Sequence, residues 1–208
     1  MTQGRFITFE GGEGTGKSTQ VLRLLERLRA RDLEVVQTRE PGGSPGAEDI
    51  RAIALNGDAG RWSPVTETLL MFAARSDHLE RTIRPALEAG RWVVCDRFAD
   101  SSRAYQGVGG GAPAAFIESL DAAIVGTTQP DLTLIFDLPV EVGLRRAFGR
   151  GLFETRFESK GMEFHERLRR GFLDIAARYP ERCVIIDADG DQDTVAGRVW
   201  AAVEARLL

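Results

Sequence analysis

The stretch GGEGTGKST, residues 11–19, combines glycines, a lysine and hydroxyl side chains at a spacing that suits phosphate binding. It matches the pattern G-x-x-x-x-G-K-[ST], in which glycines let backbone N–H groups converge on phosphate oxygens. Lys17 adds a full positive charge to the partial charge of a helix N-terminus, and Ser18 can ligate a Mg²⁺ ion that bridges the outer phosphates. The stretch therefore predicts a nucleotide-binding phosphate loop made of Gly11, Gly12, Glu13, Gly14, Thr15, Gly16, Lys17, Ser18 and Thr19.

Glu13 is an unexpected residue in a loop that binds anions. A carboxylate pointing at the phosphates would be repelled, so we expect its side chain to turn outward while its backbone N–H serves the loop. Outward lies the space for a second substrate. The plain alternative is a solvated surface glutamate.

Three more carboxylates, Asp96, Asp137 and Asp187, directly follow apolar runs. Each is a candidate ligand for Mg²⁺, although each could instead cap a helix or a turn. Asp96 is favoured because Arg97 follows at once, which joins a metal-side carboxylate to a phosphate-side cation. The stretch DSSRAYQG, residues 100–107, then supplies hydroxyls, an aromatic ring and an amide that suit recognition of a small polar ring.

Five short apolar runs must position these residues: 5–9, 34–38, 91–95, 132–136 and 182–186. Continuous apolar runs are typical of strands buried on both faces of a parallel sheet. Between them, segments such as 18–31 and 64–88 show helical spacing, with Val65, Leu69, Phe72, Leu79, Ile83 and Leu87 on one stripe. This alternation predicts an α/β fold whose ligands bind outside the carboxyl ends of the strands.

Composition places the chain among ordinary globular proteins, with 208 residues, 43% hydrophobic and 28% charged. We expect one domain spanning 1–208. The net charge of −4 argues against a general nucleic-acid or membrane-surface binder. Cys95 and Cys183 lie in apolar runs without metal or redox spacing, and no run approaches the ~20 apolar residues of a membrane span. A cytoplasmic location is expected.

Six stretches, in this order and spacing, resemble bacterial thymidylate kinases: FEGGEGTGKST, TREPGGSPGAE, LLMFAARSDHL, DRFADSSRAYQG, QPDLTLIFDLPVEVGLRRA and RGLFETRFE. The resemblance covers nearly the whole chain. It implies a three-layer P-loop NTPase fold with a five-stranded parallel sheet flanked by helices, and a homodimer. It also implies Mg²⁺-ATP as donor, thymidine monophosphate (dTMP) as acceptor and thymidine diphosphate as product.

The resemblance also implies roles for single residues. Phe72 would stack on thymine, Arg75 would donate to a thymine carbonyl and Arg97 would hold the acceptor phosphate. The implied dTMP site consists of Glu13, Arg39, Pro41, Phe72, Arg75, Arg97, Ser102, Tyr105 and Gln106, with Glu40, Gly42 and Gly43 lining the same pocket. The implied Mg²⁺ ligands are Ser18 and Asp96. Phe72 also fits a buried helix face, and its spacing of three residues from Arg75 favours the site interpretation.

The glycine- and charge-rich segment at about 149–161 predicts a mobile lid over the site. Some members of the resembling family carry a catalytic arginine directly after the acidic loop residue, and others carry it in the lid. Gly14 holds that position here, so the catalytic cations are predicted to be Lys17, Arg97, Arg150 and Arg156. His78 and His165 have no partner at metal or triad spacing and are assigned no chemistry.

Two alternatives remain open at this point. The first is a kinase of the same fold that acts on another pyrimidine nucleotide or on a deoxynucleoside. The second is a P-loop switch ATPase, which would leave the DRF, AYQG and lid stretches without a purpose. A GTPase is disfavoured, because Asn56, the sole asparagine, is followed by Gly57 and cannot begin an Asn-Lys-x-Asp guanine reader.

Overall fold

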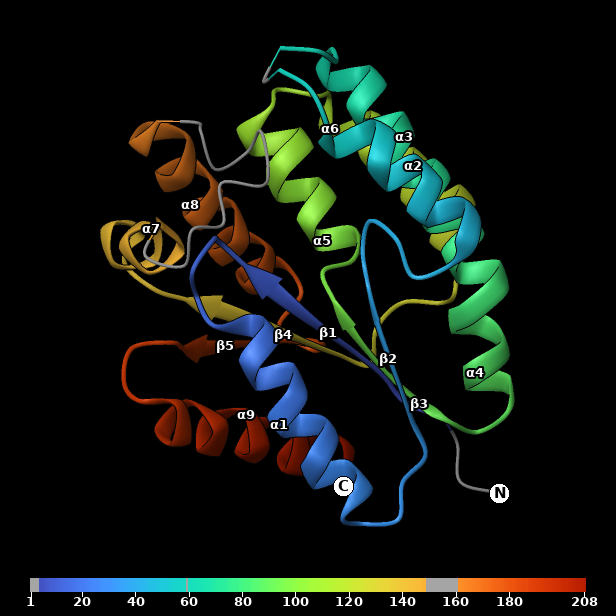
Figure 1. Ribbon diagram of the computed structural model, residues 1–208, viewed down its shortest axis with the longest axis vertical. Helices are drawn as coiled ribbons and strands as arrows, with labels where there is room; N and C mark the ends of the chain where they lie inside the picture. Colours follow the sequence, from blue (N-terminus) through green and yellow to red (C-terminus); the bar gives the residue numbers. More distant parts are fainter. Residues whose placement is uncertain (1–3, 59, 149–160) are drawn as a thin grey trace.

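Five parallel strands form one sheet at the centre of the computed structural model, which describes residues 4–58, 60–148 and 161–208 (Figure 1). They are β1 (Phe6–Gly11), β2 (Val35–Arg39), β3 (Trp92–Asp96), β4 (Leu132–Asp137) and β5 (Cys183–Asp187), in the order β2-β3-β1-β4-β5. Each apolar run becomes a strand that begins within one residue and ends within two residues of its predicted bounds. The predicted α/β fold with a five-stranded parallel sheet is confirmed.

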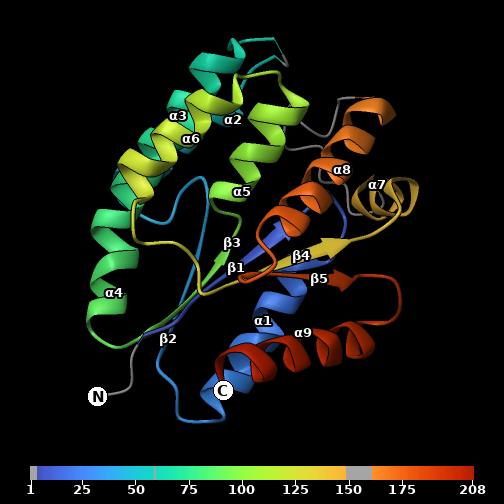
Figure 2. The ribbon, with the colours of Figure 1, turned by 180° about the vertical axis from the view of Figure 1, so that it is seen from behind.

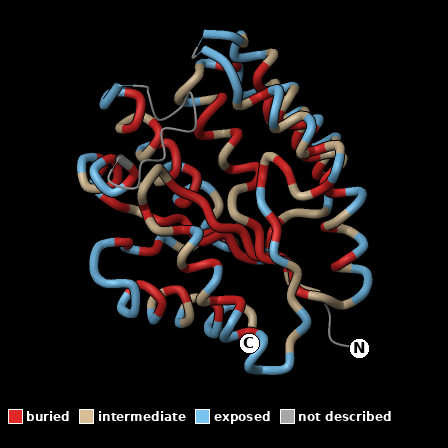
Figure 3. Tube along the Cα trace, viewed as in Figure 1, coloured by how far each residue is buried: buried red, intermediate tan, exposed pale blue. Residues whose placement is uncertain are grey.

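Helices cover both faces of the sheet and give three layers (Figures 1 and 2). On one face lie α1 (Lys17–Arg29) and α9 (Gln192–Leu207), and on the other α4 (Arg84–Glu88), α5 (Ala99–Ser102) and α8 (Met162–Arg178). Side chains of β1 alternate between the layers, as strand geometry requires. Ile7 and Phe9 join the core under α1 and α9, whereas Phe6 packs with Leu79 and Ile83 on the opposite face. Burial is concentrated in the central strands (Figure 3).

Four more helices complete the described fold: α2 (Pro45–Leu55), α3 (Pro64–His78), α6 (Ala114–Leu120) and α7 (Val140–Phe148). Three π-helical segments, Leu79–Ile83, Arg103–Gly109 and Asp121–Val125, directly follow α3, α5 and α6. The predicted helical run 64–88 is therefore one continuous rod made of α3, the first π segment and α4. Helices α2 and α3 pack side by side (Figures 1 and 2).

The apolar stripe predicted along this rod is only partly buried. Phe72, Leu79 and Ile83 are buried as expected, but Val65 and Leu69 are 42% and 47% exposed. The stripe was wrong at its first two positions, because α3 buries polar side chains instead, among them Glu67, Arg75 and His78. A buried polar face on a helix needs partners, and these lie in the site described below.

Both cysteines are buried free thiols, in agreement with the sequence. Among the described helices, none is long and apolar enough to cross a membrane. The carboxyl ends of β1, β2, β3 and β4 meet at one edge of the sheet, and the segments that follow them are the phosphate loop, the 40–43 turn, the Arg97 turn and the start of α7.

Candidate active site

The phosphate loop joins the end of β1 to the start of α1, as its motif predicts. Gly14 and Gly16 have φ values of 69° and 88°, a backbone conformation that glycine adopts at little cost. The Nζ atom of Lys17 donates to the carbonyl oxygens of Gly11 (3.1 Å) and Gly12 (2.7 Å) and lies inside the loop. Burial lowers the pKa of Lys17 to about 8. A bound anion would restore the preference for the charged form, so the loop is shaped to receive one.

Ser18 and Asp96 lie together beside this loop. The Ser18 hydroxyl donates to Oδ2 of Asp96 at 2.9 Å, whereas Asp137 accepts from Nε and Nη2 of Arg169 at 2.6 and 3.0 Å. No group of three or more His, Cys, Asp or Glu side chains in the described ranges could hold a metal. One hydroxyl and one carboxylate fit Mg²⁺, which usually keeps water and substrate phosphates as its other ligands.

Glu13 turns away from the interior of the loop, as charge repulsion predicts. Its Oε1 accepts from Nη2 of Arg97 (2.9 Å) and from the hydroxyl of Tyr105 (2.6 Å). Burial opposes ionisation of this carboxyl, but the charges of Arg97 and Lys17 prevail and lower its pKa to about 2. The group is therefore an anion at neutral pH, and it ties the phosphate loop to the side chains behind β3 and α5.

Arg97 sits at the junction of the two regions. Its φ is 69°, a left-handed value that is uncommon for residues other than glycine and often marks functional sites. Its Nη1 donates to the carbonyl of Gly11 at 2.9 Å, and its guanidinium lies 4.9 Å from the centre of the Tyr105 ring. The side chain thus holds a full charge beside both the phosphate loop and the cavity described next.

Glu10 holds the Arg97 turn in place, and sequence analysis missed it. The buried carboxylate accepts from the backbone N–H groups of Phe98 (2.8 Å) and Ser101 (3.2 Å) and from the Ser101 hydroxyl (2.5 Å). Burial raises its pKa to about 7, and Asp100 acts in the same direction. A glutamate directly after the apolar run 5–9, at a position that β1 buries, was the available signal.

A cavity opens between the phosphate loop, the 40–43 turn, α3 and the segment from Phe98 to Gln106. Seven of the nine residues predicted to bind dTMP line it: Glu13, Pro41, Arg75, Arg97, Ser102, Tyr105 and Gln106. Arg39 does not. It points to Glu48, with which it forms an exposed ion pair at 3.1 Å, whereas Arg51, which sequence analysis did not single out, lines the cavity and donates to the Pro41 carbonyl at 2.6 Å.

Phe72 also lies outside the cavity lining. Its ring is 1% exposed and packs with Ala112 and Ile117 beneath α6. Met71, one residue earlier, lines the cavity together with Phe98. The burial of Phe72 fits the core interpretation, and Met71 is the residue of this pair that the structure places at the cavity, about 100° away around the helix. Stacking of Phe72 on the base stays a prediction.

The inner end of the cavity carries polar groups that could read a base. Arg75, which is 3% exposed, lines it, and its Nη1 has no hydrogen-bond partner among the described residues. The amide Nε2 of Gln106 donates to Oε1 of Glu67 at 2.9 Å, so α3 also fixes this amide. A buried guanidinium N–H without a partner in the protein indicates a site for an acceptor atom from a ligand.

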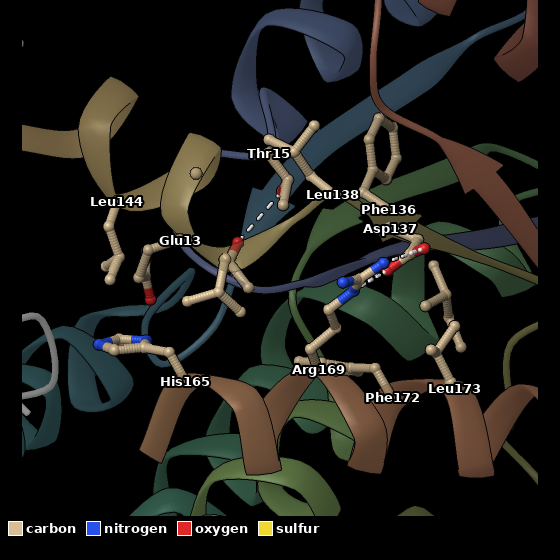
Figure 4. Close-up of a pocket in the computed structure, with 14 residues that line it drawn as sticks. Glu13, Thr15, Phe136, Asp137, Leu138, Leu144, His165, Arg169, Phe172 and Leu173 are labelled. Carbon is tan, nitrogen blue, oxygen red and sulfur yellow. Dashed lines mark hydrogen bonds and ion pairs between the residues drawn. The ribbon is translucent and has the colours of Figure 1, made fainter. Parts of the chain in front are cut away.

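A second, smaller pocket lies between the phosphate loop, the start of α7 and α8 (Figure 4). Figure 4 shows Glu13 and His165 on one side of it and the Asp137–Arg169 pair on the other. Backbone contact closes the loop on this side, since a side chain at Gly14 would collide with the carbonyl oxygen of Gly143 in α7. The lid candidates Arg150 and Arg156, with Gly149 and Gly151, lie outside the described residues.

Comparisons with known proteins agree with this arrangement. A family model described as thymidylate kinase matches residues 9–198. A thymidylate kinase of Caulobacter vibrioides is 62% identical over 207 residues, which cover 100% of this chain and 99% of that protein. One from Bradyrhizobium diazoefficiens is 54% identical and covers 99% of this chain and 91% of its own length. A crystal structure of thymidylate kinase from Ehrlichia chaffeensis matches with a TM-score of 0.78 at 33% identity, covering 97% of this chain and 99% of that one.

Proposed function

This chain belongs to the thymidylate kinase family, and from that premise we propose how its residues divide the work of phosphoryl transfer. The reaction moves the γ-phosphoryl group of ATP to dTMP and gives thymidine diphosphate and ADP, so the chain is an ATP-dependent nucleoside monophosphate kinase. The observation that carries the proposal is that Glu13 is both a residue of the phosphate loop and a wall of the cavity behind it. Donor and acceptor sites thus share one border.

The acceptor needs no general base in this scheme. A phosphate monoester has a second pKa near 6, so about nine in ten dTMP molecules are dianionic nucleophiles at pH 7. The obstacle is the charge that two polyanions bring together and that spreads over the transferring group. The protein must therefore supply positioned cations.

Lys17 and Arg97 are the described cations that we assign to this task. Lys17 would leave the loop carbonyls that it now caps and bind the outer phosphates of ATP. Arg97 would bind the acceptor phosphate, because it lies between the Gly11 carbonyl and Glu13 at the shared border. Glu13 would then be released from one cation and could accept a hydrogen bond from the sugar of dTMP.

Ser18 and Asp96 would hold Mg²⁺, which in kinases neutralises charge on the phosphates and orients them. Their contact at 2.9 Å supports this assignment, because the hydroxyl and the carboxylate already converge on one point beside the loop. ATP phosphates and water would complete the coordination.

The base of dTMP would lie at the inner end of the cavity. We propose that Arg75 donates to a carbonyl of the base and that Ser102 and Gln106 contact the edge of the base. Met71, in place of Phe72, would pack on one of its faces. Tyr105 and Pro41 would line the sugar and the entrance. Arg39 is withdrawn from this site, because it turns to Glu48 instead.

The remaining cations are proposed to come from the segment at about 149–161. Arg150 and Arg156 stay predictions, supported by the backbone contact that forbids a side chain at Gly14 and so excludes a loop arginine there. A homodimer and a cytoplasmic location also remain proposals. The exposed apolar side chains of Val65 and Leu69 on α3 support the dimer.

A panel of phosphoryl acceptors tests the function directly. Purified protein with Mg²⁺ and ATP would be offered dTMP, dUMP, dCMP, UMP and thymidine, with ADP release and labelled diphosphate measured. We expect transfer to dTMP with the largest kcat/KM and almost no ATP hydrolysis without an acceptor. A preference for thymidine or UMP would favour another kinase of this fold, and acceptor-independent hydrolysis would favour a switch ATPase.

A further inference from the structure

A buried chain of polar side chains joins β2 to α3 and ends at Arg75. The Nδ1 atom of His78 lies 3.0 Å from Oε1 of Glu40, and the other oxygen of that carboxylate accepts from Nε of Arg75 at 2.8 Å. On the far side of the imidazole, Nε2 lies 2.6 Å from the hydroxyl of Thr38. The side chains of Glu40, Arg75 and His78 are between 0% and 4% exposed, so these contacts are largely shielded from bulk water.

We propose that His78 is a positioning residue for base recognition: it orients Glu40, and Glu40 orients Arg75 toward the base of the acceptor. The inference rests on the proposed function, because it assigns a task to the inner end of the same cavity. It reverses the sequence interpretation, in which His78 had no partner. Its partners stand 38 and 40 positions away in the chain, beyond the reach of any local spacing rule.

The chemistry of the contacts fixes which group donates and which accepts in each of these hydrogen bonds. An ionised carboxylate only accepts hydrogen bonds, so the Nδ1 atom of His78 must carry the proton that faces Glu40. In the neutral imidazole, Nε2 is then an acceptor, and the Thr38 hydroxyl donates a hydrogen bond to it. Because His78 binds one oxygen of the Glu40 carboxylate, the orientation of this carboxylate is fixed, and its other oxygen is held where Nε of Arg75 can donate to it.

Arg75 is thereby held on two of its nitrogen atoms and left open on the third. Its Nε is bound to Glu40 and its Nη2 donates to the Ser102 hydroxyl at 3.1 Å, whereas Nη1 has no partner among the described residues. The rings of Phe72 and Phe98 lie 4.5 and 5.2 Å from its guanidinium carbon and restrict it further. A single open donor in a fixed place can read a carbonyl oxygen and reject an amino group.

The backbone around Gly43 packs against the hydrogen bond between Thr38 and His78. A side chain at Gly43 would collide with the Thr38 hydroxyl and with the His78 ring, so the turn packs directly on their hydrogen bond. Thr82 adds a hydrogen bond from its hydroxyl to the Gly43 carbonyl at 2.8 Å. His78 therefore also couples the position of the 40–43 turn, which carries Pro41 at the cavity, to α3.

Two substitutions at His78 separate its contacts. His78→Asn keeps an amide nitrogen near the place of Nδ1, where it can donate to Glu40, and loses the contact to Thr38. His78→Gln places its amide nitrogen near Nε2 instead and leaves Glu40 without this donor. The readout is the ratio of kcat/KM for dTMP to that for 5-methyldeoxycytidine monophosphate, whose pyrimidine ring carries an amino group where thymine carries the 4-carbonyl.

We expect His78→Gln to lower this ratio by about 10-fold or more, the scale of one hydrogen bond to a charged group, mainly by raising KM for dTMP. KM for ATP should change less than twofold, and His78→Asn should keep most of the discrimination. Thermal unfolding of both variants measures the purely structural effect. Equal loss of discrimination in the two variants, or wild-type discrimination in His78→Gln, would overturn the proposal.

Glu40→Gln tests the same step from the other end if His78→Gln does not fold. The amide keeps the shape of the side chain, but its NH2 group must face either His78 or Arg75, both of which donate to Glu40. One of these hydrogen bonds is therefore lost, and the discrimination should fall by a similar factor. Wild-type discrimination in a folded Glu40→Gln protein would also overturn the proposal. The proposed function fails by a different result, namely a wild-type protein that does not phosphorylate dTMP.

Discussion

Met71 and Phe72 are adjacent in sequence but have opposite environments, and the base contact depends on which of them faces the cavity. Met71 lines the cavity, and Phe72 is buried against Ala112 and Ile117. We predict that Met71→Ala raises KM for dTMP by about 10-fold, near the lower end of the 1–3 kcal/mol that stacking of a base on an aromatic ring contributes. Steady-state kinetics with dTMP varied at saturating ATP measures this change.

Phe72→Leu is the matched control. It removes ring volume from the core and should lower the melting temperature, at a cost of about 1 kcal/mol in stability, while KM for dTMP stays within twofold. The reverse pattern, with KM raised in Phe72→Leu and unchanged in Met71→Ala, would restore Phe72 as the base platform.

The site residues differ in how far sequence could predict them. Gly11–Thr19 form a local motif whose spacing fixes the geometry, so the strand, loop and helix stand where the motif predicts them. Phe72 is absent from the cavity lining because spacing relative to Arg75 gives only an approximate helix phase, and one position changes the direction by about 100°. Glu10 and His78 were missed because their partners come from other strands and helices, and Glu40 was expected in the pocket lining but without its contacts to His78 and Arg75.

The close contact between the phosphate loop and α7 decides where the catalytic cations can come from. A Cβ atom at Gly143 would lie 2.5 Å from the carbonyl oxygen of Glu13, and one at Gly14 would strike the Gly143 carbonyl. Two glycines thus let a loop and a helix approach backbone to backbone. The predicted absence of a loop arginine follows from this packing as well as from the residue type at Gly14.

We predict that Gly143→Ala lowers kcat/KM for ATP by up to about 10²-fold, since a displacement near 1 Å in the loop is enough for such a loss. The added methyl group cannot be accommodated unless α7 or the loop moves, because both partners are backbone atoms. Measurement of kcat and both KM values, with unfolding followed by circular dichroism, checks the prediction.

Gly197→Ala is the control for adding a methyl group to a helical glycine that has no close neighbour. Gly197 lies in α9, and open space surrounds the place that a Cβ atom would occupy there. Alanine should therefore stabilise the protein by about 0.5–1 kcal/mol and leave the kinetics unchanged. Wild-type kinetics in Gly143→Ala would show that the loop tolerates movement of α7, and the proposed role of this contact would be wrong.

The strands and helices themselves were predictable because their signals are local. Each strand is built around a short apolar run, and α1 repeats its apolar residues at helical spacing. The first half of the rod formed by α3 and α4 did not follow its apolar pattern, since its inner face serves the cavity with Glu67, Arg75 and His78. Polar residues of the candidate site therefore occupy buried positions of α3 where a core helix would carry apolar residues.

At the scale of the whole molecule, α3 has two faces with different tasks. Its inner face carries Met71 and Arg75 at the cavity, and its outer face exposes Val65 and Leu69, which stand one helical turn apart. If the outer face is the contact between two copies of the chain, as proposed, each copy supports the helix that reads the base in its own cavity.

We predict that Leu69→Glu converts the protein from dimer to monomer. Burial of an unpaired carboxylate in each half of a symmetric contact should cost on the order of 3 kcal/mol per side, which weakens association by roughly 10⁴-fold in total. Sedimentation velocity should give about twice the chain mass of 22.8 kDa for the wild type and the single chain mass for the variant. Because α3 also carries Arg75, KM for dTMP should rise more than KM for ATP.

Leu22→Glu provides the control, since Leu22 on α1 is 54% exposed and lies on the opposite face of the sheet from α4 and α8. It should leave both mass and kinetics at wild-type values. A monomeric wild type would refute the dimer itself, and a Leu69→Glu protein that still sediments as a dimer would move the contact away from this face of α3. A monomeric Leu69→Glu protein with an unchanged KM for dTMP would keep the interface but separate it from base recognition.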